Sequence, residues 1–415
     1  MPDPGRQNVG VVLSGGGING ILLELGFLKR LSEDPVWPRV GWIYGTSAGA
    51  LSGAMAALDR LDDLEDFLLA LRPEEAFRPR RVWQFPLGGL HDYMLPETMA
   101  ERLGDDEELG SALAASDIDL VVFATDVSEP IDGDRTRHFE LVYSSHSTPP
   151  ETMGRAILAS AAISAIVLPV RVDGAIATDG GWVRNFPLEH AYHNPDVEAI
   201  AAFRYLSAYP PVDVGFLERL RERLERFRAV PPVRALLAEL RLAEERWQRG
   251  EPAHYPELIT RLMRVAINRN TFLDERFADE RDLSVVELHR LREDVVAAAV
   301  AAAPPWRRRR LRAELADRFA AARFPFRHDR HVPRVVVRAT AGDDALESTF
   351  RGEPPWSEES KRALITRGYR LTDEELARSG DLLRSRAEGR QGPGQAVGPH
   401  AGDRSGPGEP GPDRD

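Results

Sequence analysis

The most reactive arrangement in the sequence is a serine between glycines where a predicted strand meets a predicted helix. Gly45-Thr46-Ser47-Ala48-Gly49 follows a predicted strand at 40–44 and precedes an Ala/Leu-rich helix that runs to about Leu58. A sharp strand-to-helix turn with small neighbours lifts a serine oxygen clear of the backbone, and the helix start adds a positive dipole end. Ser47 is therefore a candidate nucleophile for acyl transfer, and Gly45 and Gly49 permit the turn.

A second glycine-rich turn lies where the first predicted strand, 9–13, meets its helix. Gly15, Gly16 and Gly17 can direct backbone N–H groups at an anion, which in acyl transfer is the tetrahedral oxyanion. Their spacing with Gly20 also fits a dinucleotide loop. That alternative is disfavoured because the second strand ends in Gly45-Thr46-Ser47, where a dinucleotide site needs a carboxylate.

A third motif, Asp179-Gly180-Gly181, follows a short predicted strand at 176–177. A carboxylate held by a glycine turn could accept the serine proton. Since the ordinary pKa of aspartate is about 3.9, the site must be dry enough to make Asp179 a stronger base. Taken alone, the same three residues are more typical of a β-turn.

The elements that must position these motifs alternate between strand and helix. Such alternation favours an α/β fold with a mostly parallel sheet. The strands are predicted from short buried runs at 9–13, 40–44, 119–124, 139–143, 176–177 and 197–203.

Three regions follow from the changes in composition. We expect a catalytic α/β domain at 1–206 and a mostly helical extension at 207–386, long enough to be a lid or cap. Within the extension, a strand is predicted at 335–337 and a last helix at 357–366, ended by Gly368. The segment 387–415 has 8 Gly and 5 Pro in 29 residues, so we expect it to be disordered.

Composition excludes several classes of protein. Acidic residues outnumber basic ones by 66 to 54, and the net charge of −12 argues against nucleic-acid binding. There is no cysteine, so disulfides and thiolate metal sites are excluded, and no His/Asp/Glu spacing suggests another metal site. No signal peptide and no apolar run of about 20 residues is found, which favours a cytoplasmic protein without a membrane span.

Together the three motifs resemble the patatin-like phospholipase family over about Val9 to Leu206, in the family's order. The resemblance implies a three-layer α/β/α fold with a patatin-like sheet. Supporting stretches lie at Ala124-Thr125-Asp126, at 159–163 and at Asn185-Phe186-Pro187.

The resemblance also implies an activity and its residues. Ser47 would be the nucleophile, Asp179 the base of a dyad without histidine, and the amides of Gly15, Gly16 and Gly17 the oxyanion hole. The reaction would be hydrolysis of a lipid or other fatty-acyl ester through an acyl-serine, with no cofactor and no metal.

Two positions depart from the family pattern. Asn19 stands where the family usually has Arg or Lys, which weakens the preference for phospholipid, and Ser164 replaces a proline. Asn19 is the one hint of the alternative function, a catalytically silent lipid-binding or scaffolding protein on the same fold.

Two further alternatives remain open. A Ser-Asp-His triad could use His190 or His193, although an α/β-hydrolase elbow usually follows more strands than two. The basic cluster Arg307–Arg310, beside Trp306, could touch anionic lipid headgroups as a peripheral membrane contact, but a solvated helix face is the interpretation we favour.

Overall fold

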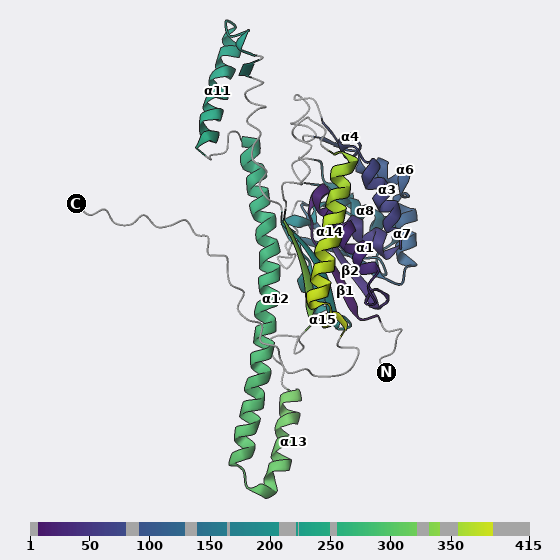
Figure 1. Cartoon of the computed structure of the whole chain (residues 1–415), viewed down its shortest axis with the longest axis vertical. Helices are drawn as coiled ribbons and strands as arrows, with labels where there is room; N and C mark the ends of the chain where they lie inside the picture. Colours follow the sequence, from purple (N-terminus) through teal and green to yellow (C-terminus); the bar gives the residue numbers. More distant parts are fainter. Residues whose placement is uncertain are drawn as a thin grey trace, which may run out of the picture.

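The structure is a computed structural model in which an α/β domain lies beside a long helical rod (Figure 1). The expected disordered segment 387–415 lies outside the described residues. These are 7–79, 91–128, 139–163, 167–206, 221–222, 224–249, 255–321, 332–340 and 356–384.

The α/β domain is built on an eight-stranded mixed sheet with the order β10-β9-β1-β2-β5-β8-β7, and β6 pairs with β5. The first five strands in this order are parallel, whereas β6 and β8 run antiparallel to β5, and β7 antiparallel to β8. The expected α/β fold is confirmed. The strands are β1 (Val9–Leu13), β2 (Val40–Thr46), β5 (Asp119–Asp126), β6 (Glu140–Ser144), β7 (Val170–Val172), β8 (Ala175–Asp179), β9 (Ala199–Leu206) and β10 (Arg334–Thr340).

The central strands are buried on both faces, so successive side chains enter two different cores. In β1, Val11 and Leu13 join the larger core, whereas Val12 joins the smaller core on the opposite face. This explains why the central strands are continuous apolar runs without polar alternation. A separate antiparallel pair joins β3 (Phe77–Pro79) to β4 (His91–Tyr93).

Helices cover both faces of the sheet. The larger core is closed by α1 (Gly17–Ser32), α2 (Ala48–Ala57), α3 (Leu61–Ala70), α7 (Asp106–Ala114), α8 (Pro150–Ser160) and α14 (Glu358–Ser379). The smaller core packs against α9 (Leu188–His193) and α12 (Tyr255–Ala302). Short helices complete the domain: η1 (Trp37–Arg39), α4 (Pro73–Ala76), α6 (Leu95–Arg102), η3 (Gly180–Trp182) and α15 (Asp381–Arg384).

The predicted end of the last helix at Gly368 is wrong, because α14 continues to Ser379. Gly368 lies where α14 crosses α1, and a Cβ there would come 2.0 Å from the carbonyl oxygen of Leu23. Gly26 of α1 is its counterpart, with a Cβ position 2.0 Å from the carbonyl oxygen of Ile365. The two glycines therefore allow close helix packing, and Gly368 does not act as a helix stop.

Part of the segment 207–386 belongs to the α/β domain. The predicted strand at 335–337 is found as β10, which pairs with β9, and α14 then packs on α1. Between these parts and the first half of the chain lie α11 (Pro231–Gln248), α12 and α13 (Pro305–Ala321). At 48 residues, α12 is roughly 72 Å long and forms the axis of the rod (Figure 1).

The basic cluster lies at the start of α13, which folds back along the end of α12 (Figure 1). Trp306 is 82% exposed, and Arg310 forms an ion pair with Glu314. Lipid contact through this cluster stays the alternative to the solvated helix face that we favour. Among the described helices, none is long and apolar enough to cross a bilayer.

Candidate active site

The register of the sheet brings the serine and aspartate motifs together. Strand β2 pairs with β5 up to Thr46 opposite Phe123, and β8 pairs with the next stretch of β5 from Ala124 opposite Asp179. Because β2 and β8 run in opposite directions along β5, their carboxyl ends meet head to head. Ser47, the residue after Thr46, therefore lies beside Asp179.

Ser47 occupies a strained turn between β2 and α2. Its φ angle is +54°, a conformation that a residue with a side chain rarely adopts. The flanking glycines are sterically required. A Cβ at Gly45 would lie 2.2 Å from the carbonyl oxygen of Gly49, and one at Gly49 would lie 2.7 Å from Leu13. The turn therefore has the geometry that the sequence predicted.

The side chains of Ser47 and Asp179 are hydrogen-bonded. Ser47 Oγ donates to Asp179 Oδ2 at 2.6 Å, and the other carboxylate oxygen accepts the Gly181 N–H at 2.7 Å. Both side chains are buried, and burial raises the pKa of Asp179 to about 6 against the opposing effect of these two hydrogen bonds. The carboxylate is thus a stronger base than an exposed aspartate.

The Asp-Gly-Gly backbone is fixed by its neighbours. The Thr125 hydroxyl donates to the Asp179 carbonyl oxygen at 2.7 Å. A Cβ at Gly180 would lie 2.2 Å from the carbonyl oxygen of Phe123, so only glycine allows this turn to approach β5. These contacts hold the carboxylate toward Ser47.

Ser160, the last residue of α8, supports the turn at Ser47 through two hydrogen bonds. Its buried hydroxyl accepts the Ser47 N–H at 2.8 Å and donates to the Phe123 carbonyl oxygen at 2.6 Å. One side chain therefore connects α8, β5 and the strained residue. The backbone N–H of Ser47 is therefore already hydrogen-bonded and is not available to a ligand.

Replacing Ser160 with alanine should leave the Ser47 amide and the Phe123 carbonyl without their partner. Leaving buried polar groups unsatisfied costs about 1–3 kcal/mol, which urea unfolding would measure. Ester turnover should also fall, because the turn loses its support. Ser52→Ala is the matched control, since the buried Ser52 hydroxyl donates to Glu24 at 2.9 Å. The role of Ser160 is contradicted if the two variants lose turnover equally.

In the glycine-rich loop, one of the three backbone N–H groups predicted to bind an oxyanion is already hydrogen-bonded within the protein. The Gly15 N–H donates to the Asn185 carbonyl oxygen at 2.9 Å, so this donor is occupied. The amides of Gly16 and Gly17 find no acceptor among the described residues, and Gly17, with φ +58°, begins α1. Of the three amides predicted to bind an oxyanion, those of Gly16 and Gly17 are therefore still available, and this role stays a prediction for them.

Asn185 links this loop to the rod. Its side-chain amide donates to the hydroxyl of Thr271, a fully buried residue of α12, at 2.8 Å. The side-chain amide of Asn270 donates to the carbonyl oxygen of Trp182. These bonds place the middle of α12 against the site.

Further along the helix, ion pairs attach α12 to the α/β domain. Arg184 donates to Asp274 of α12 at 2.6 Å and also pairs with Glu140 and Glu189. The three carboxylates raise the pKa of Arg184 despite its burial, so its charge is permanent. Burial raises the pKa of Asp274 to about 7 in spite of the attached Arg184.

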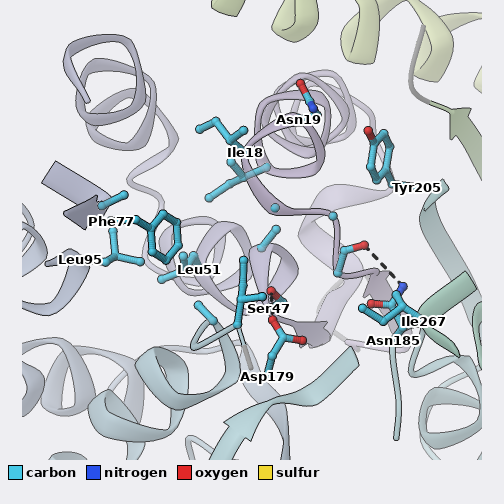
Figure 2. A pocket seen from close by; sticks show the side chains of 18 of the residues that line it. Ile18, Asn19, Ser47, Leu51, Phe77, Leu95, Asp179, Asn185, Tyr205 and Ile267 are labelled. Atoms are coloured by element: carbon cyan, nitrogen blue, oxygen red, sulfur yellow. Dashed lines mark hydrogen bonds between the residues drawn. The ribbon is translucent and has the colours of Figure 1, made fainter. Parts of the chain in front are cut away.

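A cavity of about 300 Å³ opens beside Ser47 and Asp179 (Figure 2). In Figure 2, Leu51, Phe77 and Leu95 lie on one side of the pair, and Asn185 and Ile267 lie on the other. The wall is mostly apolar, as expected for an acyl chain. Further described lining residues are Gly15–Gly17, Ile18, Asn19, Ile21, Ala48, Phe67, Leu68, Leu71, Ala76, Ala161, Ile163, Trp182, Tyr205, Met263, Arg264, Asn268 and Trp356.

Neither histidine of the alternative triad is among the described residues that line this cavity. The ring of His190 lies edge-on to Phe123, with centroids 4.6 Å apart, and its Nε2 is 3.7 Å from Glu140. Burial and the nearby Arg184 lower the pKa of His190 to about 4. His193 contacts Arg281 of α12. Both histidines thus have other partners, and Ser47 bonds to Asp179.

Several residues of the site were not assigned a role from the sequence. Ser160 and Asn185 entered only as flanks of the motifs, and Thr271 lies on a helix without a motif. The one available signal was the polar set Asn268, Asn270 and Thr271 in a helix otherwise rich in Arg, Glu, Leu and Ala. Such a signal marks a buried polar contact without saying what it contacts.

The fold and site define an α/β protein with a buried serine–aspartate pair beside an apolar cavity. Residues 11–192 match a family model described as "Patatin-like phospholipase". This match to the patatin-like phospholipase family supports a lipid hydrolase at the level of the family.

Two other comparisons add little. A search among curated proteins found no match. The chain is similar to a solved structure described as the crystal structure of VipD from Legionella pneumophila, with 12% identity over 91% of this chain and 68% of that one. The TM-score is 0.36, too low to carry an argument.

Proposed function

We propose that this protein is a serine acyl hydrolase that cleaves fatty-acyl esters of lipids, with Ser47 and Asp179 as its catalytic dyad. The observation that supports it most is the 2.6 Å hydrogen bond between the two buried side chains at the edge of an apolar cavity. Nucleophile, base and acyl-binding surface then lie together, as the chemistry requires.

The reaction has two balanced steps. Ser47 Oγ attacks the ester carbonyl carbon while its proton passes to Asp179 Oδ2. The bond between the carbonyl carbon and the alcohol oxygen then breaks, and the departing alcohol oxygen takes the proton from Asp179. Water next attacks the acyl-serine, gives its proton to Asp179, and the acyl–Ser47 bond breaks as Ser47 regains a proton. The products are a fatty acid and an alcohol.

The tetrahedral oxyanion would be stabilised at the start of α1. The amides of Gly16 and Gly17 are the donors in this proposal, and the positive end of the α1 dipole favours the same charge. Gly15 contributes indirectly, because its bond to Asn185 fixes the loop.

Activity should rise with pH through about 6. Asp179 accepts a proton only when it is ionised, and its raised pKa of about 6 sets the midpoint of kcat/KM. Its folded-state pKa lies above the ordinary value, so protonation of Asp179 favours the folded state. Protonation of Asp179 at pH 5 should therefore not unfold the protein, so the loss of activity at this pH should be a loss of the base. A flat profile between pH 5 and 8, with an unchanged Tm, would contradict this role of Asp179.

The experiment that tests the proposal is turnover of p-nitrophenyl esters of increasing chain length by the purified full chain. We expect release of p-nitrophenol, with a preference for chains that fill the apolar wall. The competing function, a silent lipid-binding or scaffolding protein, would retain a fluorescent fatty-acyl lipid without releasing acid. Retention without turnover at every chain length would favour that function.

A further inference from the structure

The face of α12 turned away from the α/β domain carries exposed apolar residues. Thr271, Asp274 and Ala278 are buried on the inner face, toward the α/β domain, which lies along one side of the rod (Figure 1). On the opposite side of the helix, four large apolar residues are 43–64% exposed: Val265, Leu273, Leu283 and Leu291. Apolar residues aligned along an exposed helix face are typical of an interaction surface.

Four charged residues lie between these apolar residues on the same face. Two arginines come first along the chain, Arg269 and Arg276, and two glutamates follow, Glu280 and Glu287. All four are exposed, and successive members of the whole set of eight are three or four residues apart, which keeps them in one stripe. The outer stripe of α12, as we call these eight residues, is therefore neutral in a chain of net charge −12.

The apolar residues of the outer stripe match those of a second copy that runs antiparallel. With a two-fold axis at the level of Ala278, Leu273 of one chain would lie opposite Leu283 of the other. Val265 would lie opposite Leu291 in the same way. This contact would be roughly 39 Å long, which is about four heptads and enough for a coiled coil. The match ends there, because the next level would set an apolar residue against a carboxylate.

The charged residues determine the direction of the second helix. In the antiparallel pair, Arg269 would lie opposite Glu287, and Arg276 opposite Glu280. In a parallel pair each residue would meet its own copy, so arginine would face arginine. Within one chain, Arg276 and Glu280 already pair at 2.6 Å. Arg269 and Glu287 are 18 residues apart, roughly 27 Å along the helix, so only a second chain brings them together.

We propose that the protein forms a homodimer in which the outer stripes of two α12 helices pack antiparallel about a two-fold axis. The stripe is self-complementary, as an interface with this symmetry requires, since each contact then occurs twice. The inner face of each α12 would stay on its own α/β domain, so each Ser47–Asp179 pair is complete within one chain. The dimer does not depend on the proposed activity.

The test is charge reversal at Arg269 and Glu287, with the mass of the full chain measured by sedimentation equilibrium. Wild-type protein should pass from 46.1 kDa to twice this mass as its concentration rises. Arg269→Glu and Glu287→Arg each set like charges opposite one another at both symmetry-related sites. Each should raise the Kd of the dimer roughly 10–100-fold. An equimolar mixture of the two variants restores opposite charges at both sites, so it should dimerise like the wild type.

Arg309→Glu is the matched control, because Arg309 is an exposed arginine of α13, outside the outer stripe. It should keep the wild-type Kd. All of these residues are exposed, so circular dichroism should show the same helix content in every variant. Wild-type protein that stays monomeric at high micromolar concentration would overturn the proposal. A dimer that neither reversal weakens, or a mixture that dimerises no better than either variant alone, would also overturn it.

Discussion

Replacing Ser47 with alanine should reduce ester turnover on the order of 10⁴-fold or more. The substitution removes the oxygen that forms the acyl intermediate, and only the oxyanion donors and substrate binding remain to accelerate attack by water. Single-turnover measurements with a p-nitrophenyl ester would show the loss as a missing burst of p-nitrophenol.

The fold should tolerate this change. Ser47 Oγ makes its hydrogen bond to Asp179, whereas the Ser47 N–H keeps its bond to Ser160 in the variant. A cooperative unfolding transition close to that of the wild type would show that the loss is chemical. Turnover that persists in Ser47→Ala would exclude Ser47 as the nucleophile.

Asp179→Asn should lower kcat by about 10²–10⁴-fold, the range for a positioned acid–base group. Asparagine has almost the same shape and can still accept the Gly181 N–H, but its amide cannot take the proton of Ser47. The rise of activity through pH 6 should disappear with the carboxylate. Rates measured between pH 5 and 8 would show both effects.

Asp34→Asn is the matched control for Asp179→Asn. Asp34 is also buried, but it lies near the end of α1, where it pairs with Arg384, and it is not among the residues lining the cavity. This control should retain turnover and its pH profile. Should Asp179→Asn behave like the control, another group would have to be the base, and His190→Gln and His193→Gln would be tested next.

Local patterns were sufficient to predict much of the fold and to single out the two residues of the proposed dyad. Apolar runs at 9–13, 40–44 and 119–124 correspond to β1, β2 and β5, since a strand covered on both faces excludes polar residues. The glycines around Ser47 and Asp179 mark turns that no larger residue can adopt, so they are visible in a single sequence.

Other features depend on contacts between segments far apart in the chain. Gly368 has the sequence signature of a helix stop, but its role is set by Leu23 of α1, which the sequence places 345 residues away. The amide of Gly15 is unavailable because of the Asn185 carbonyl. The position of α12 depends on single polar contacts such as Thr271 with Asn185, which have no periodic pattern.

The most direct test of the Ser47–Asp179 dyad is labelling with a fluorophosphonate, followed by identification of the modified residue by peptide mass spectrometry. The reagent modifies only an activated serine, and the chain contains no cysteine to compete for it. We predict one adduct, on Ser47, that is absent in Ser47→Ala and strongly slowed in Asp179→Asn. An adduct on another serine, or no adduct on the folded wild-type protein, would contradict the account.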